Sequence, residues 1–134
     1  MTVLSTSATD RATLDAALSR PDKRLVVCLC AAWCDTCEQF KTTFARLARS
    51  DPDASYLWID IEDDSELVGD VDIENFPTIA VYRARVPVFF GVTLPQESVV
   101  SRTLVALASE TAGRVDVPPL IAGLPEALRG LNRP

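Results

Sequence analysis

Residues 25–37 read Leu25-Val26-Val27-Cys28-Leu29-Cys30-Ala31-Ala32-Trp33-Cys34-Asp35-Thr36-Cys37. The first eight are apolar without interruption, which is typical of a central strand covered on both faces. The Cys-x-x-Cys pair follows this strand at the point where we expect a helix over residues 35–49 to open. Side chains three apart on a helix have Cβ atoms about 5–6 Å apart, and a disulfide needs about 3.5–4.5 Å. A small local adjustment therefore closes a bond between Cys34 and Cys37.

The Cys34/Cys37 pair is better suited to exchange than to structural support. A disulfide across so short a loop removes only about 2 kcal/mol of chain entropy from the unfolded state. The start of a helix places unsatisfied N–H groups and a positive dipole end beside Cys34, and both favour its thiolate, the species that attacks disulfides. The charge of Asp35 opposes this effect, and we expect a reducing rather than an oxidising protein.

Composition restricts the classes of function. The chain has 134 residues, 48% of them hydrophobic, which suits one compact core. Its net charge of −6 argues against nucleic acid or an anionic membrane as the main partner, because both attract basic surfaces. No apolar run approaches the roughly 18 residues of a membrane span, and residues 1–5 lack the pattern of a signal peptide. We therefore expect a cytoplasmic protein.

The chain contains no histidine, which excludes Ser/His and Cys/His nucleophilic pairs and every histidine-containing metal site. Cys28 and Cys30 fall on one face of the predicted strand, where buried cysteine commonly behaves as a small apolar residue. With Cys34 and Cys37 they also spell C-x-C-x3-C-x2-C, so a four-thiolate metal site remains an alternative.

The remaining pattern predicts an α/β domain of order β-α-β-α-β-α-β-β-α. We expect strands at 3–6, 25–30, 54–61, 78–82 and 86–90, and helices at 8–19, 35–49, from 63 to Val68 or Val71, and from near Pro95 onward with Gly113 near its end. Pro87 cannot donate to a ladder and should lie on an edge strand. Helices would cover a central mixed sheet. We divide the chain into a domain over 1–110 and an extension over 111–134, whose leucines recur at helical spacing between prolines and should pack on the domain.

These features together resemble the thioredoxin family. Ala32-Trp33-Cys34-x-x-Cys37 follows a buried strand, and Asn75-Phe76-Pro77-Thr78 lies further along the chain. The two segments match the two signature segments of that family. Gly91 falls where the family has a glycine after its last strand. The resemblance covers roughly residues 3–110 and implies the thioredoxin fold.

The resemblance also implies a mechanism. Cys34 would be the exposed attacking thiol and Cys37 the shielded resolving thiol of a thiol–disulfide oxidoreductase that reduces protein disulfides without a bound cofactor or metal. Pro77 would be cis and lie against the sulfurs, and Phe76 would offer backbone groups to an extended substrate. Trp33 and Gly91 would border the same groove. A NADPH-dependent thioredoxin reductase would be the recycling partner.

Among this chain's departures from the family, the residues near the resolving cysteine bear on this mechanism. The family usually keeps a buried aspartate and a lysine near the resolving cysteine, and this chain has Cys28 and Trp58 there. Water, or Asp60 if it points inward, would have to accept the proton of Cys37. The missing pair also supports an alternative, a thioredoxin-fold binding protein with vestigial redox activity. We expect the active disulfide to be Cys34–Cys37, with Cys28 and Cys30 reduced.

Overall fold

The computed structural model describes residues 3–20, 24–68, 76–108 and 113–131. Its strands are β1 Arg24–Cys30, β2 Ala54–Asp60, β3 Thr78–Arg83 and β4 Val86–Val92. Its helices are α1 Ala8–Leu18, α2 Asp35–Arg49, α3 Ser65–Val68, α4 Glu97–Leu107, α5 Pro119–Ala122 and α6 Leu124–Gly130.

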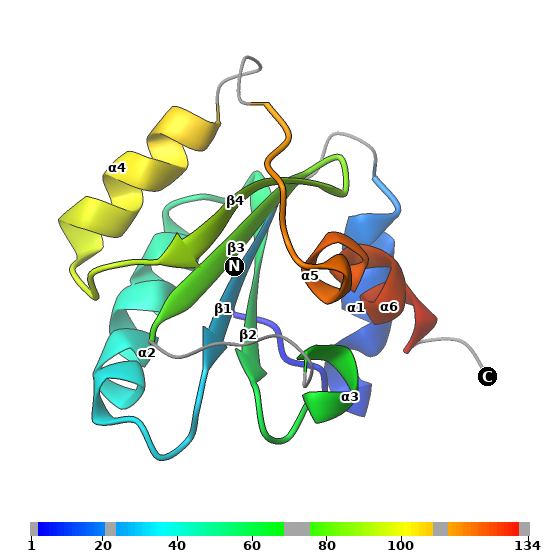
Figure 1. Ribbon diagram of the computed structural model, residues 1–134, viewed down its shortest axis with the longest axis horizontal. Coiled ribbons are helices and arrows are strands. Elements are labelled where there is room, and N and C mark those ends of the chain that lie inside the picture. The colour runs from blue at the N-terminus through cyan, green and yellow to red at the C-terminus, as the bar shows by residue number, and fades with distance from the viewer. Residues whose placement is uncertain (1–2, 21–23, 69–75, 109–112, 132–134) are drawn as a thin grey trace.

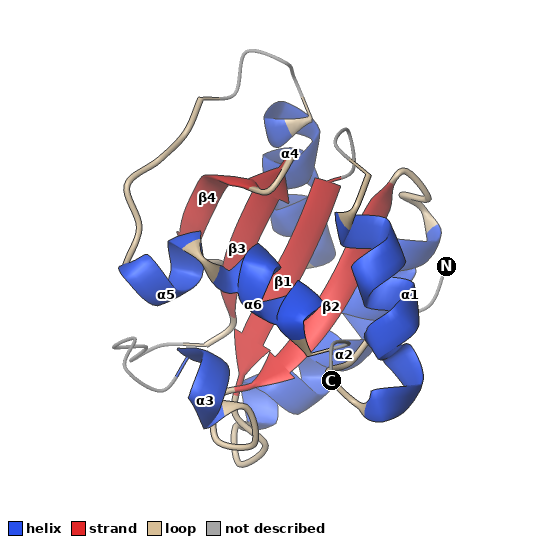
Figure 2. Ribbon diagram, turned by 90° about the vertical axis from the view of Figure 1, so that its right-hand side faces the viewer, coloured by secondary structure: helices blue, strands red, loops and turns tan. Residues whose placement is uncertain are grey.

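The strands form one mixed sheet in the order β2-β1-β3-β4. Strand β1 runs parallel to β2 and antiparallel to β3, and β3 runs antiparallel to β4. Helices α2 and α4 lie on one side of the sheet, and α1, α3, α5 and α6 lie on the other (Figures 1 and 2). The predicted thioredoxin-type architecture, a mixed sheet flanked by helices, is confirmed.

Strand β1 is the central element predicted from its apolar run, because it has a neighbour on each side. Its side chains alternate between two buried clusters. Val26, Cys28 and Cys30 join the cluster under α2 and α4, which we call the sulfur face. Leu25, Val27 and Leu29 join the cluster under α1, α3, α5 and α6, which we call the tail face. Placement on the sulfur face brings the strand cysteines under helix α2.

The first predicted strand, at residues 3–6, is reduced to a single bridge between Leu4 and Leu57. Leu4 exchanges two backbone hydrogen bonds with β2, at 2.8 and 3.0 Å. The N–H of Ser5 points to the other side of the strand, away from β2, and donates to the Asp10 carboxylate at 2.9 Å. This bond turns the chain into α1 after one paired residue.

The hairpin between β3 and β4 forms where it was predicted. Ala84 and Arg85 both have positive φ, 51° and 66°, as a tight two-residue hairpin turn requires. Strand β4 is an edge of the sheet, as expected for the strand that holds Pro87.

Helix α4 starts later than expected. Pro95 lies outside it, because Gln96 is the N-cap and has extended backbone angles. The helix ends at Leu107, well before Gly113. Of the expected third helix, Val71 lies outside the described residues.

The C-terminal segment packs on the tail face of the sheet. Ile121, Leu124 and Leu128 are fully buried there. The Tyr82 hydroxyl donates to the carbonyl oxygen of Ile121 at 2.6 Å, and the N–H of Val115 donates to the carbonyl oxygen of Pro87 on β4 at 3.0 Å. The predicted boundary at 110/111 falls outside the described residues, so the division into a domain and an extension stays a prediction.

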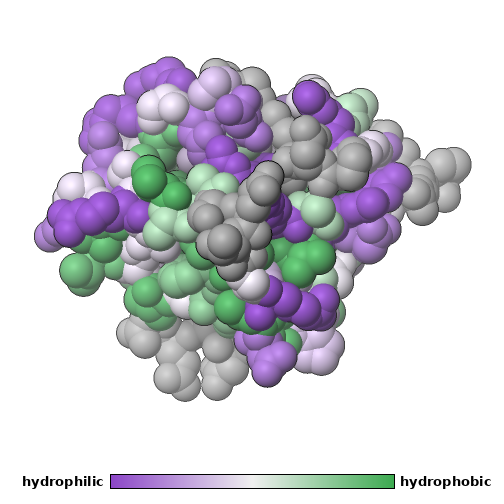
Figure 3. All heavy atoms as spheres, turned by 90° about the horizontal axis from the view of Figure 1, so that it is seen from above, coloured by the Kyte–Doolittle hydropathy of each residue, from purple (hydrophilic) through white to green (hydrophobic). Residues whose placement is uncertain are grey.

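Figure 3 looks down on the end of the molecule that faces away from the start of α2, and hydrophobic side chains gather near the middle of this view. A shallow pocket lies where α2 and α4 end, and Leu47, Leu104 and Val105 line its apolar part. Its polar part is satisfied internally, since Arg24 and Asp51 form an ion pair at 2.8 Å.

Candidate active site

The site forms where β1 ends and α2 begins. The N–H of Cys34 donates to the carbonyl oxygen of Ala31 at 3.1 Å, which folds the connecting loop into a tight turn. Cys34 is then the N-cap of α2, with extended backbone angles, and its carbonyl accepts the N–H of Glu38 at 3.1 Å. The Cys34 thiol is free and only partly buried. It is therefore the accessible thiol of the site, at the positive end of a 15-residue helix.

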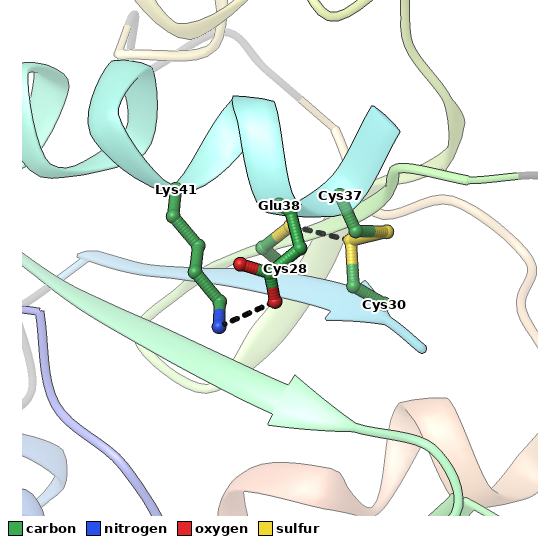
Figure 4. The surroundings of a disulfide bond; sticks show 5 residues. All are labelled: Cys28, Cys30, Cys37, Glu38 and Lys41. Carbon is green, nitrogen blue, oxygen red and sulfur yellow. Dashed lines mark hydrogen bonds and ion pairs between the residues drawn. A yellow bond between two sulfur atoms is a disulfide. The ribbon is translucent and has the colours of Figure 1, made fainter. Parts of the chain in front are cut away.

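Cys37 lies one turn further along, on the buried face of α2, and is only 1% exposed. Its sulfur is bonded to Cys30 at the end of β1, with the two Cα atoms 5.9 Å apart (Figure 4). The expectation that Cys37 pairs with Cys34 and that Cys30 stays reduced is wrong for this structure. Cys34 and Cys37 are neighbours only along the helix, whereas the packing of α2 across β1 sets Cys37 directly over Cys30.

Cys28 is free and fully buried, as expected. Its Sγ lies 3.7 Å from the Sγ of Cys30. Burial raises the pKa of the Cys28 thiol well above its usual range, so this sulfur carries its proton at neutral pH. It supplies apolar packing rather than a charge.

Two of the positions at which this chain departs from the family pattern are direct neighbours, because Cys28 on β1 pairs with Trp58 on β2. The Trp58 ring packs against Phe44 and lies 5.7 Å from the ammonium group of Lys41. Lys41 in turn forms a 3.0 Å ion pair with Glu38 (Figure 4). This half-exposed charge pair belongs to the turn of α2 that follows Cys37. Sequence reasoning missed it because the pair comes from the helix rather than from the strands.

Asp60 does not turn toward the thiols. Its Oδ1 accepts the backbone N–H groups of Glu62 and Asp63, at 2.8 and 3.1 Å. These bonds cap the turn that follows β2, which is the ordinary role of a carboxylate at the end of a strand.

The expected substrate-binding residues are only partly brought together. Trp33 is 67% exposed, and its ring meets Phe76 edge-on with centroids 5.6 Å apart. The Phe76–Pro77 peptide bond is cis, and the carbonyl of Pro77 accepts the N–H of Thr93 at 3.1 Å. Gly91 lies on β4 opposite Ile79. Asn75 lies outside the described residues.

Glu62 is a further site residue that the sequence did not indicate. Its carboxylate accepts the indole N–H of Trp33 and so holds the exposed ring in place. Nothing in the sequence distinguishes Glu62 from its neighbours, because it belongs to an acidic run that is typical of a solvated helix start.

Two features are absent from the described residues. No group of three or more His, Cys, Asp or Glu side chains there could hold a metal ion, although all four cysteines are included. No helix in the same ranges is both long and apolar enough to cross a bilayer.

The sequence profile of the family described as Thioredoxin matches residues 5–94. This chain belongs to the thioredoxin family. A putative thioredoxin 2 of Streptomyces coelicolor is 34% identical over 59 residues, which are 44% of each chain. The curated thioredoxins that match first are covered over 12% to 66% of their own length.

Solved thioredoxin structures show the same fold as this family member. The germline-specific thioredoxin Deadhead of Drosophila melanogaster superposes with a TM-score of 0.65 at 23% identity, over 80% of this chain and 99% of that one. A thioredoxin f2, solved in complex with ferredoxin:thioredoxin reductase, superposes with a TM-score of 0.66 at 21% identity, over 81% of this chain and 96% of that one.

Proposed function

We propose that this thioredoxin-family chain is a thiol–disulfide oxidoreductase that reduces protein disulfides. One observation carries the proposal. Cys34 is a free, partly exposed thiol at the start of α2, and Cys37 is a shielded cysteine in the next turn. Cys34 can attack a substrate disulfide, and Cys37 can then attack the mixed disulfide from the buried side. These are the two roles that the reaction needs.

The reaction starts from the reduced protein. The Cys34 thiolate attacks one sulfur of the substrate disulfide and expels the other as a thiolate, which takes a proton from water. The resolving Cys37 thiolate then attacks Cys34 Sγ in the mixed disulfide and releases the second substrate thiolate. Two electrons pass to the substrate, and Cys34 and Cys37 end as a disulfide. Cys37 can act only when its bond to Cys30 is open.

The substrate segment would lie beside Trp33, Phe76, Pro77 and Gly91. Trp33 supplies an exposed apolar ring that Glu62 and Phe76 hold in position. The backbone of Phe76 would pair with an extended segment in the manner of an added strand.

A NADPH-dependent thioredoxin reductase in the cytoplasm is the reductant that we propose, with no cofactor bound to this chain. The similar thioredoxin f2 was solved with a ferredoxin:thioredoxin reductase, which makes a ferredoxin-linked enzyme the competing reductant. Supplying either reductase with its own electron donor, and dithiothreitol as the reference, distinguishes the two partners.

The test is reduction of insulin disulfides by the full chain. We expect Cys34→Ser to reduce the rate to the uncatalysed background, because it removes the attacking sulfur. Cys28→Ala is the matched control, since it removes a buried thiol on the adjoining strand that makes no disulfide. If Cys34→Ser keeps most of the activity, the proposed mechanism is wrong.

The bond between Cys30 and Cys37 favours a second candidate, a binding protein whose redox chemistry is vestigial. In that state Cys34 has no resolving partner. The same assay decides between the two functions. Multiple turnovers by the pre-reduced wild-type chain support the reductase, and a rate equal to background supports the binding protein.

A further inference from the structure

The four sulfurs form a path from the surface to the core. Cys34 is partly exposed and packs against the sulfur face, Cys37 is bonded to Cys30, and Cys28 lies 3.7 Å beyond Cys30. The proposed reduction of substrate uses only the outer two. Cys30 is therefore an oxidisable sulfur, in contact with the resolving thiol, that the reaction leaves unused.

We propose that Cys30 is a second resolving thiol, which moves the disulfide from the Cys34–Cys37 pair to the buried Cys30–Cys37 pair. This inference rests on the proposed function, which supplies the Cys34–Cys37 disulfide. The Cys30 thiolate attacks Cys37 Sγ, the Cys30–Cys37 bond forms, and the bond from Cys37 to Cys34 breaks. Cys34 leaves as a thiolate and takes up a proton in place of the one that Cys30 lost. The protein stays oxidised by two electrons throughout, so no further oxidant is needed.

The packing of α2 on β1 supports transfer of the disulfide toward Cys30. The Cα atoms of Cys30 and Cys37 are 5.9 Å apart, near the commonest separation for a disulfide. Helix α2 and strand β1 hold this separation through the apolar cluster that surrounds both residues. The bond joins two elements that already pack together.

The exchange stops at Cys30. Cys28 is two residues away on the same strand, and residues at that spacing have Cα atoms about 6.6–6.8 Å apart, at the upper limit for a disulfide. The inner thiol therefore contacts the disulfide without joining it.

After the transfer, the oxidised protein carries a buried disulfide and a free thiol at its surface. Cys30 and Cys37 are each only 1% exposed, so a protein reductase cannot reach their disulfide directly. Cys34 meanwhile is free again at the surface. Reduction must begin with the reverse step, in which the Cys34 thiolate attacks Cys37 Sγ. The Cys30–Cys37 disulfide is therefore inaccessible to partner proteins until Cys34 attacks it and re-forms the Cys34–Cys37 disulfide.

The test follows the thiols during one round of oxidation. The pre-reduced full chain receives one equivalent of insulin disulfide and is quenched with acid at intervals. Free thiols take a light maleimide, and reduction then exposes the remainder to a heavy one. All four cysteines lie between Arg24 and Lys41, so fragmentation of a single tryptic peptide assigns each label.

We expect heavy label first on Cys34 and Cys37, and later on Cys30 and Cys37, with light label restored to Cys34. In Cys30→Ala the second stage should be lost, with Cys34 and Cys37 heavy at every time. In Cys28→Ala both stages should survive. Cys28 and Cys30 are equally buried on the same face, so this control matches the packing change.

Three further outcomes separate the inference from the proposed function. If insulin is reduced but Cys34 and Cys37 remain the final heavy pair in wild type, the transfer is wrong and the reductase stands. If Cys34→Ser forms the Cys30–Cys37 bond as fast as wild type, the bond does not come through Cys34, and the transfer is again wrong. If wild type reduces no insulin, the proposed function fails. The inference is overturned with it.

Discussion

The two faces of the sheet differ in what their side chains do. The fully buried side chains of the tail face are aliphatic apart from Tyr82, and two short helices from the C-terminal segment complete its cover. The sulfur face holds all four cysteines along with the aromatic rings of α2 and β2. Strand β1 contributes to both faces through alternate side chains, as β2 and β3 also do. The chain thus keeps its main aliphatic packing on one side and its reactive sulfurs on the other.

The largest expected effect comes from a substitution that disrupts the packing of the tail face. Leu124→Ala removes a fully buried side chain of α6 and should lower the free energy of unfolding by about 2–5 kcal/mol. Insulin reduction at a temperature where the variant stays folded should be unchanged, because the thiols lie across the sheet. Val105→Ala is the control, since Val105 is 71% exposed, and should change stability by less than about 0.5 kcal/mol. Urea unfolding measures both. Equal losses in the two variants would show that the C-terminal segment does not complete the core.

The second prediction separates the faces by pH. Burial raises the pKa of Cys28 on the sulfur face and of Tyr82 on the tail face. The unfolded chain therefore loses these protons first, at about pH 8.5 and about pH 10. Stability from each group is complete below its unfolded pKa and falls as pH rises above it, by up to about 1.4 kcal/mol per pH unit.

Cys28→Ala should accordingly remove the loss that begins near pH 8.5, while Tyr82→Phe should leave it in place. Tyr82→Phe should reduce only the steeper loss above about pH 10, where buried Tyr56 also contributes. Urea midpoints of the oxidised chain between pH 7 and 11 measure both limbs. A Cys28→Ala curve that still falls from pH 8.5 would assign the first limb to another group.

Much of the fold was predictable because its signals are local. The unbroken apolar run gave β1 a central position, and the stripe of Cys37, Phe40, Phe44 and Leu47 placed α2 correctly. The hairpin around Ala84 followed from two short strands with a polar turn between them. Each of these patterns is complete within about fifteen residues, so no tertiary contact was needed to interpret it.

The features that sequence reasoning missed depend on contacts between distant segments. The Cys30–Cys37 bond arises from the way that α2 crosses β1. The hydrogen bond from Tyr82 to Ile121 joins positions 39 residues apart. The first strand is short for a local reason, since the Ser5 amide binds the Asp10 carboxylate and the chain turns into α1 after one paired residue. The placement of Cys28 and Cys30 on one face of β1 could be predicted from the sequence. The contact of Cys30 with Cys37 on α2 could not.

The smallest predicted effect compares one ion pair on each face. Arg129 of α6 bonds Asp15 of α1 at 3.3 Å on the tail face, with side chains 21% and 27% exposed. Arg46 of α2 bonds Glu97 of α4 at 2.6 Å on the sulfur face, with side chains 48% and 46% exposed. Exposed pairs contribute about 0.2–1 kcal/mol, and salt screens them.

Because the Arg129 pair is less exposed, we expect its coupling energy to be the larger of the two, although both stay below about 1 kcal/mol. Double-mutant cycles measure the two couplings, with Arg129→Gln and Asp15→Asn on one face and Arg46→Gln and Glu97→Gln on the other. Raising the salt concentration should erase the Arg46 coupling first, since water and ions reach it more freely. A larger coupling at Arg46 would mean that the shorter distance outweighs exposure, and that α4 is held to α2 as firmly as the C-terminal helices are held to α1.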